Sequence, residues 1–162
     1  MFKKILALAL ALVLVLAFAG CEANKSETEE AEVVQGMVTD GKLVMGTNCG
    51  FEPFEYLDAD GNPTGFDVEM AKAMAEAIGV ELQIVDMDFD GLIAALKSGQ
   101  VDMVVAGMTV TDERKESVYF TAPYFDASQV IIVPEGSEAV KTAADLEGKK
   151  VGVQDGTTGD LY

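Results

Sequence analysis

Strands and helices alternate along the middle of the chain, and this alternation limits the possible folds more than any other feature of the sequence. Three apolar runs of strand length are separated by two segments whose apolar residues recur at helical spacing. The strands are expected at 43–46, 80–85 and 101–106, and the helices at 68–78 and 91–98, capped by Asp67 and Asp90 and ended by Gly79 and Gly99. Such a succession predicts an α/β fold with a parallel sheet and helices on both faces.

Smaller elements are expected before and after this unit. A hairpin should run from 54–57 to 64–66, because Asp60-Gly61 between them is a strong turn signal. Thr111 is placed to cap a charged helix over 112–117. Further along, strands are expected at 129–133 and 149–153, and a short helix at 142–146.

Polar and aromatic residues follow the predicted strand ends, where parallel α/β sheets bind their ligands. The segments that meet at this rim are 48–51, 89–90 and 107–109. Asn48 either contacts a ligand side chain or forms a turn, and Phe51 and Phe89 either wall a ligand or belong to the core. Gly107 permits close approach of a ligand, and Thr109 adds a hydroxyl. These residues form the candidate site.

The charge balance and the absence of histidine exclude several classes of function. The chain has 28 acidic and 11 basic residues, a formal net charge of -17 and no His. Nucleic acid is therefore not an expected partner, because phosphates are bound through Lys and Arg. Without imidazole there is no Ser-His-Asp or Cys-His catalysis and no histidine zinc ligand.

No motif in the chain predicts a cofactor or a metal, and none is expected. Gly156 to Gly159 can present N–H groups to an anion, but no P-loop Lys-Ser/Thr follows them. Asp58 to Asn62 superficially imitates a calcium loop, yet Pro63 stands where that loop needs glycine. Cys49 has no basic neighbour to make it reactive, which indicates a small buried thiol.

The first forty residues have the composition of an export signal and a tether. Residues 1–20 combine two lysines, an apolar run and a small-residue end, and are too short for the roughly 20 residues of a spanning helix. The run 16–21 resembles the lipobox of bacterial lipoproteins, which implies acylation of Cys21, although Phe18 departs from the usual aliphatic residue. Acidic residues in 21–39 predict an extended tether.

Arg114 is the only arginine in the chain, and its placement in the first turn of a helix is electrostatically unfavourable. A buried anion would compensate, because a guanidinium binds a carboxylate through two parallel hydrogen bonds. The alternative is a surface arginine paired with Glu113 or Glu116.

Residues 127–162 are too few to bury a core of their own, because units below about 40 residues usually need disulfides, metals or partners. The sequence is therefore expected to be a piece of a longer chain. The alternative is a complete short protein with a frayed end.

The segments 47–56, 65–68, 87–93 and 106–114 form a series of ordered motifs. Together they resemble the extracellular solute-binding proteins, family 3, the amino-acid receptors of ABC importers, and the resemblance runs from about residue 40 to the end. It implies a two-lobe, type II periplasmic-binding-protein-like α/β fold that closes on one amino acid, with the second lobe incomplete. The implied divisions are signal 1–20, tether 21–39, first lobe 40–123, hinge crossing 124–128 and start of the second lobe 129–162.

The resemblance also implies roles for seven ligand-binding residues. Arg114 is similar to the arginine that grips the ligand carboxylate, with Thr109 assisting, and Gly107 to the residue whose carbonyl accepts from the ammonium. The others are the aromatic walls Phe51 and Phe89, the side-chain reader Asn48, and Thr158, which completes carboxylate binding on closure. Because the family often has Asp at position 48, Asn48 weakens the case for a basic ligand. The acid that pairs the ammonium is expected beyond residue 162, so the cleft should be incomplete.

The implied partners are an amino acid, the permease of an ABC importer and a membrane reached through the lipid anchor. Two other functions share the fold. The chain also resembles periplasmic cyclohexadienyl dehydratases, whose general acid would lie in the missing lobe, and the ligand-sensing domains of receptors, which carry a transmembrane helix downstream.

Overall fold

The computed structural model describes residue 38 and residues 41–161. The chain divides into two units, residues 1–41 and residues 42–162. The predicted signal peptide and Cys21 lie outside the described residues, as does the predicted tether apart from Val38. The helices and strands of the described residues all belong to the second unit.

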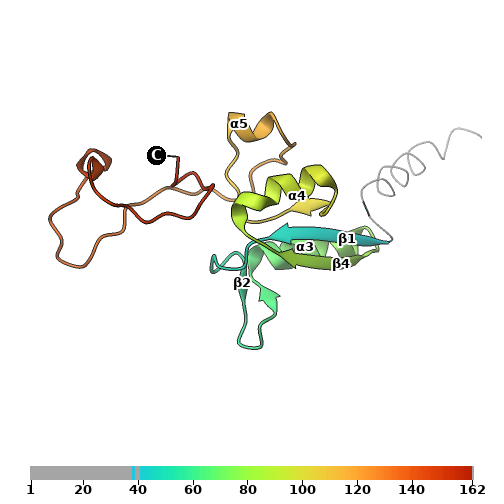
Figure 1. Ribbon diagram of the computed structural model, residues 1–162. Helices are drawn as coiled ribbons and strands as arrows, with labels where there is room; N and C mark the ends of the chain where they lie inside the picture. Colours follow the sequence, from blue (N-terminus) through green and yellow to red (C-terminus); the bar gives the residue numbers. More distant parts are fainter. Residues whose placement is uncertain (1–37, 39–40, 162) are drawn as a thin grey trace, which may run out of the picture. The chain divides into compact units, whose positions relative to one another are not determined.

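A parallel three-stranded sheet lies at the centre of the second unit, as predicted (Figure 1). The middle strand, β1 (Lys42–Thr47), pairs on one side with β4 (Glu81–Asp86) and on the other with β5 (Met103–Val104). The third strand is shorter than the predicted 101–106. At its start the Asp102 carboxylate, rather than a carbonyl, accepts from the Val44 N–H at 2.8 Å. Val101, Val105 and Ala106 are nevertheless buried. The apolar run therefore predicts correctly which residues are buried, but not which of them pair with β1.

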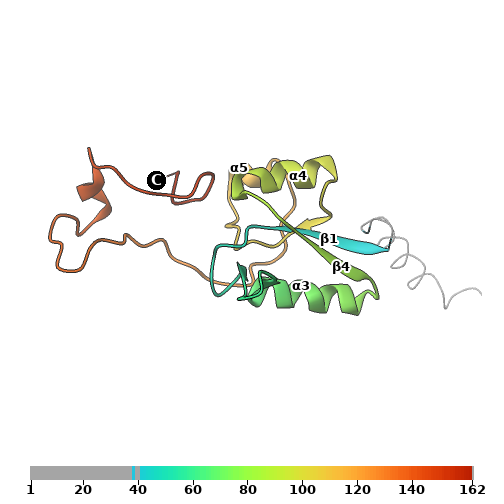
Figure 2. The same ribbon diagram turned by 60° about the horizontal axis from the view of Figure 1, so that its bottom comes forward.

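One helix covers each face of this sheet, which confirms the predicted layers (Figure 2). On one face α3 (Phe66–Ala77) buries Val68 and Ala71 against Met45. On the other face α4 (Leu92–Ser98) buries Leu92. A Cβ on Gly46 would meet Leu92 at 3.3 Å, so the glycine leaves room for α4 to pack on β1.

Both predicted acidic helix caps are wrong. The residue before α3 is Gly65, whose φ of 116° and whose ideal Cβ position, 2.3 Å from the Phe54 carbonyl oxygen, require glycine. Asp67 lies instead in the first turn, fully buried. Asp90 belongs to a 3-10 turn, η1 (Phe89–Gly91), and makes no capping hydrogen bond. The helix ends are as predicted, because Gly79 and Gly99 are left-handed.

The predicted hairpin and the predicted Thr111 cap are confirmed. The hairpin pairs β2 (Tyr56–Leu57) with β3 (Pro63–Thr64), and Asp58 closes its turn by accepting from two backbone N–H groups. Thr111 Oγ1 accepts from the Arg114 N–H at 3.2 Å and begins α5 (Asp112–Lys115), which is shorter than expected.

Among the described residues after 127 there is no strand, so the strands predicted at 129–133 and 149–153 are wrong. The expected short helix is a 3-10 turn, η2 (Ala143–Leu146), with Thr142 at its capping box. Apolar side chains of this region stay in contact with water: Val130 is 74% and Ile132 90% exposed. In the described part of the chain neither run has a neighbouring strand with which to pair.

Residues 38 and 41–161 contain no helix long and apolar enough to cross a membrane. The same residues contain no cluster of three or more His, Cys, Asp or Glu that could hold a metal ion.

Candidate functional site

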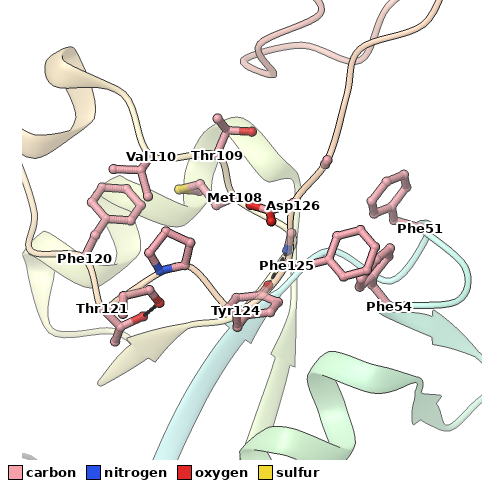
Figure 3. A pocket seen from close by; sticks show the side chains of 14 residues that line it. Phe51, Phe54, Met108, Thr109, Val110, Phe120, Thr121, Tyr124, Phe125 and Asp126 are labelled. Carbon is pink, nitrogen blue, oxygen red and sulfur yellow. Dashed lines mark hydrogen bonds between the residues drawn. The ribbon is translucent and has the colours of Figure 1, made fainter.

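A pocket of about 340 Å³ opens between the segment after β5 and the predicted crossing segment 124–128 (Figure 3). Three of the predicted ligand-binding residues line it: Phe51, Gly107 and Thr109. The others that line it are Phe54, Met108, Val110 and the run 120–127. Asp126 is the one charged residue among the described residues that line the pocket.

Three aromatic rings gather on one side of this pocket (Figure 3). The rings of Phe51 and Phe54 are stacked with centroids 5.5 Å apart, and those of Phe54 and Phe125 are edge-to-face with centroids 4.8 Å apart. Phe51 was predicted as an aromatic wall from its place after a strand. Phe54 and Phe125 were missed as site residues because the sequence places one in a hairpin and the other in a crossing segment.

Gly107 lies where the pocket meets the interior of the unit. Its φ is 54°, and a Cβ there would approach the Phe51 ring to 3.4 Å, so glycine keeps the ring and the backbone in contact. Its N–H donates to Asp67 Oδ2 at 2.9 Å and to the Tyr124 hydroxyl at 3.2 Å. The backbone of Gly107 is therefore fixed by the buried Asp67 and by Tyr124, which lines the pocket.

Arg114 is 8% exposed and does not line the pocket itself, although it contacts Thr109, which does. It donates through Nη1 to the Thr109 carbonyl at 2.6 Å and through Nη2 to the Gly156 carbonyl at 2.7 Å. The guanidinium carbon lies 5.5 Å from the centroid of the Phe89 ring, a cation–π contact. These contacts bring together three of the predicted residues, Thr109, Arg114 and Phe89.

The charge of Arg114 has no carboxylate partner in the described part of the chain. Neither Glu113 nor Glu116 forms the ion pair considered as the alternative. Burial lowers the pKa of Arg114, and the Glu113 charge partly offsets this; the guanidinium stays protonated. The predicted clash with a helix dipole carries little weight, because α5 has only four residues and Arg114 also lies in its last turn.

Asn48 and Thr158 do not line the pocket and are held by glutamines. Asn48 donates to the Met87 carbonyl at 2.7 Å and accepts from Gln154 Nε2 at 2.7 Å. Thr158 Oγ1 accepts from Gln129 Nε2 at 2.8 Å. The Gln154 contact places Asn48 near the same segment, 154–156, that Arg114 contacts.

Cys49 is only partly buried, which differs from the buried thiol that the sequence indicated. Burial raises its pKa to about 11, and the neighbouring Asp86 carboxylate adds to the effect. A thiol with so high a pKa forms little thiolate at neutral pH.

The family model for bacterial extracellular solute-binding proteins, family 3, matches residues 43–157. Among the relatives, the arginine-binding extracellular protein ArtP of Bacillus subtilis is 43% identical over 155 residues, which is 96% of this chain and 57% of ArtP. The chain therefore spans a little over half the length of this relative.

Two solved structures extend the comparison. The arginine-bound form of truncated ArgBP from T. maritima is 53% identical with a TM-score of 0.73, covering 75% of this chain and 58% of that one. The arginine-bound form of domain 1 alone from the same protein is 52% identical with a TM-score of 0.52, covering 53% of this chain and 68% of that one.

Proposed function

Because the chain belongs to the bacterial extracellular solute-binding proteins, family 3, we propose that it binds a free amino acid outside the cell and delivers it to the permease of an ABC importer. The observation that carries this proposal is Arg114. A guanidinium that is buried without a carboxylate has lost hydration that nothing in the described chain fully replaces. The carboxylate of a free amino acid is an anion of the right size and geometry to replace it.

Arg114 would hold the ligand carboxylate, with two of its five N–H donors already fixing the guanidinium against backbone carbonyls. The face of Phe89 keeps the plane of the guanidinium oriented. Phe51 and Phe54 would cover the ligand stem, and the Gly107 carbonyl would accept from its ammonium. Asn48 and Thr158 remain proposed ligand contacts; to act, each would exchange its present glutamine partner for the ligand.

Arginine is the first ligand to test. Two similar proteins are named for arginine binding, at 43% and 53% identity. Asn48 favours a ligand other than arginine, because it lacks the negative charge that would pair with a basic side chain. Asp126 supplies a carboxylate at the pocket and could meet a ligand cation. A panel of amino acids that includes glutamine, the neutral counterpart, separates these expectations.

The described part of the chain is proposed to bind without the rest of a second lobe. The isolated domain 1 of ArgBP is described in an arginine-bound form, which supports binding by the first lobe alone. Closure of a second lobe would add further contacts to the bound amino acid. These contacts are expected to raise the affinity of a site that already binds without them.

Calorimetry of the 162-residue chain with the amino-acid panel tests the function. Arg114→Ala should weaken binding by roughly 30-fold or more, the range for truncating one member of a buried charge pair (about 2–5 kcal/mol). Arg114→Lys should also weaken binding, because the charge remains but the planar fork is lost. Lys115→Ala is the matched control. The Lys115 side chain follows Arg114 in the sequence, is exposed, and pairs with Asp112 at the surface. The absence of binding to every amino acid would contradict the function, and equal binding by Arg114→Ala would remove Arg114 from the site.

Export and lipid anchoring through Cys21 complete the proposal. They rest on the signal-like run 1–20 and the lipobox-like run 16–21. A receptor that serves a permease benefits from being held at the membrane, and two or three acyl chains suffice for stable anchoring. Mass spectrometry of the protein from the membrane fraction tests acylation, with Cys21→Ser as the control. The dehydratase and sensor functions have no observation in their favour.

A further inference from the structure

Two acidic side chains, Glu55 and Asp67, are buried together behind the pocket. Glu55 is 1% and Asp67 0% exposed. Backbone bonds hold their segments together, since the Asp67 N–H donates to the Phe54 carbonyl at 2.9 Å. The Glu55 carboxyl also reaches Gly107, because Oε1 lies 3.8 Å from the position of a Cβ there.

Each of these carboxyl groups has one buried oxygen without a hydrogen-bond partner among the described residues, Glu55 Oε2 and Asp67 Oδ1. Neither group forms an ion pair with a Lys or Arg in that part of the chain. Two ionised carboxylates in this position would repel each other, and both orphan oxygens would be costly. A single proton between the two groups removes one charge and turns one orphan oxygen into a donor for the other.

Burial raises the pKa of Glu55 to about 8, and the adjacent Asp67 carboxyl group adds to the effect. The proton is therefore expected to reside chiefly on Glu55 at neutral pH. Among the described residues, Cys49 and Tyr124 also sense the Glu55 charge, and burial raises the pKa of both. Both stay neutral up to pH 8, so Glu55 is the group that changes charge near that pH.

The other oxygen of Asp67 links the pair to the pocket. Oδ2 accepts from the Tyr124 hydroxyl at 2.9 Å and from the Gly107 N–H at 2.9 Å. Tyr124 begins the predicted crossing segment, and its ring stacks on Phe66 in α3 with centroids 6.1 Å apart. One carboxylate thus ties together a helix, the crossing segment and the pocket-lining glycine.

We propose that Glu55 and Asp67 share one proton, and that this carboxyl–carboxylate pair is a positioning device that holds Gly107 and Tyr124 in place for ligand binding. When the proton is lost, Asp67 faces a second negative charge and its Oδ2 no longer holds both donors in the same geometry. The effect on ligand affinity rests on the proposed function; the shared proton and its effect on Gly107 do not.

Carbon-13 NMR of the glutamate carboxyl groups tests the shared proton directly. The Glu55 signal should titrate near pH 8, whereas exposed glutamates titrate near their ordinary pKa of about 4.3. Asp67→Asn replaces the neighbouring charge by an amide donor, so the Glu55 titration should move down toward the ordinary value. A Glu55 signal that titrates below about pH 6 in the unsubstituted chain would overturn the shared proton.

The Gly107 amide signal tests the positioning role without any ligand. It should shift together with the Glu55 titration and become independent of pH in Glu55→Gln, in which an uncharged amide can still donate to Asp67. Arginine affinity should fall about tenfold between pH 7 and pH 9 in the unsubstituted chain and much less in Glu55→Gln. A Gly107 signal that ignores the Glu55 titration would overturn the positioning role. Absence of arginine binding at every pH, with the Gly107 titration intact, would contradict an arginine-binding function and leave the pair established.

Discussion

In residues 42–127 a core of apolar side chains is removed from water between a sheet and two helices, whereas in residues 128–161 comparable side chains stay exposed. Met45 in β1 is 0% exposed, and Ile132 in the later region is 90% exposed. The residue types are similar, so the difference lies in their neighbours. The strand β1 is paired on both edges, while the run 129–133 is paired on neither edge in the described chain. Burial and strand pairing therefore depend on contacts distant in sequence, not on the apolar run itself.

Amide hydrogen exchange should separate the two regions by the largest margin. Amides of β1 and α3 should exchange at least about 1,000-fold more slowly than those of 129–133, because exchange in a core requires an opening that costs several kcal/mol. Mass spectrometry of peptides from one sample compares both regions under the same conditions, so each is the control for the other. Equal protection in the two regions would mean that residues 128–161 pair with something in solution.

The elements that depend on local chemistry were predictable from the sequence. Gly79 and Gly99 end helices because a left-handed residue costs glycine nothing, and Thr111 caps α5 through its own hydroxyl. The parallel sheet followed from the order of strands and helices. The signals for the helix ends and the Thr111 cap lie within a few residues of their effects.

The errors arose where a distant partner decides the outcome. Asp67 has the residue type and the position of a helix cap. Its carboxylate instead accepts hydrogen bonds from Tyr124 and Gly107, which are 57 and 40 residues away in the sequence. The Asp102 carboxylate, rather than a backbone carbonyl, accepts the hydrogen bond from the Val44 N–H of β1, and this shortens β5. No local pattern carries that information.

The candidate site divides in the same way. Arg114 stood out because it is the only arginine, and Gly107 and Thr109 because they follow a strand. The residues of the crossing segment that line the pocket, such as Phe125 and Asp126, were missed as site residues, since their approach to Phe54 and Met108 is set by tertiary packing.

Truncation of one apolar side chain in each region is the second test of the comparison. Met45→Ala should lower the free energy of unfolding by about 2–5 kcal/mol, because it leaves a cavity among Val68, Ala71 and Val105. Ile132→Ala should change it by no more than about 0.5 kcal/mol, since the side chain is already in water. Urea denaturation followed by circular dichroism measures both. A large loss in Ile132→Ala would show that the later region has a packed partner in solution.

Acidification should loosen the η2 turn of the second region and leave the Gly107 signal of the first region unchanged, and this is the smallest expected effect. In η2 the Asp145 carboxylate accepts from the N–H groups of Lys141 and Thr142 at 2.9 and 2.8 Å, and these bonds lower its pKa. A lowered pKa means that the turn is stabilised above the ordinary aspartate pKa of about 3.9 and loses this support as the pH falls through the lower value. Glu55 in the first region has a raised pKa, so its protonated form is already present and lowering the pH brings it no penalty.

The amide signals of Lys141 and Thr142 should therefore move toward unfolded values below about pH 4, while that of Gly107 stays constant. Asp145→Asn should reproduce the acid form of the turn at neutral pH and leave Gly107 unaffected; a Gly107 signal that moves with the turn at acid pH would show that the two regions are coupled.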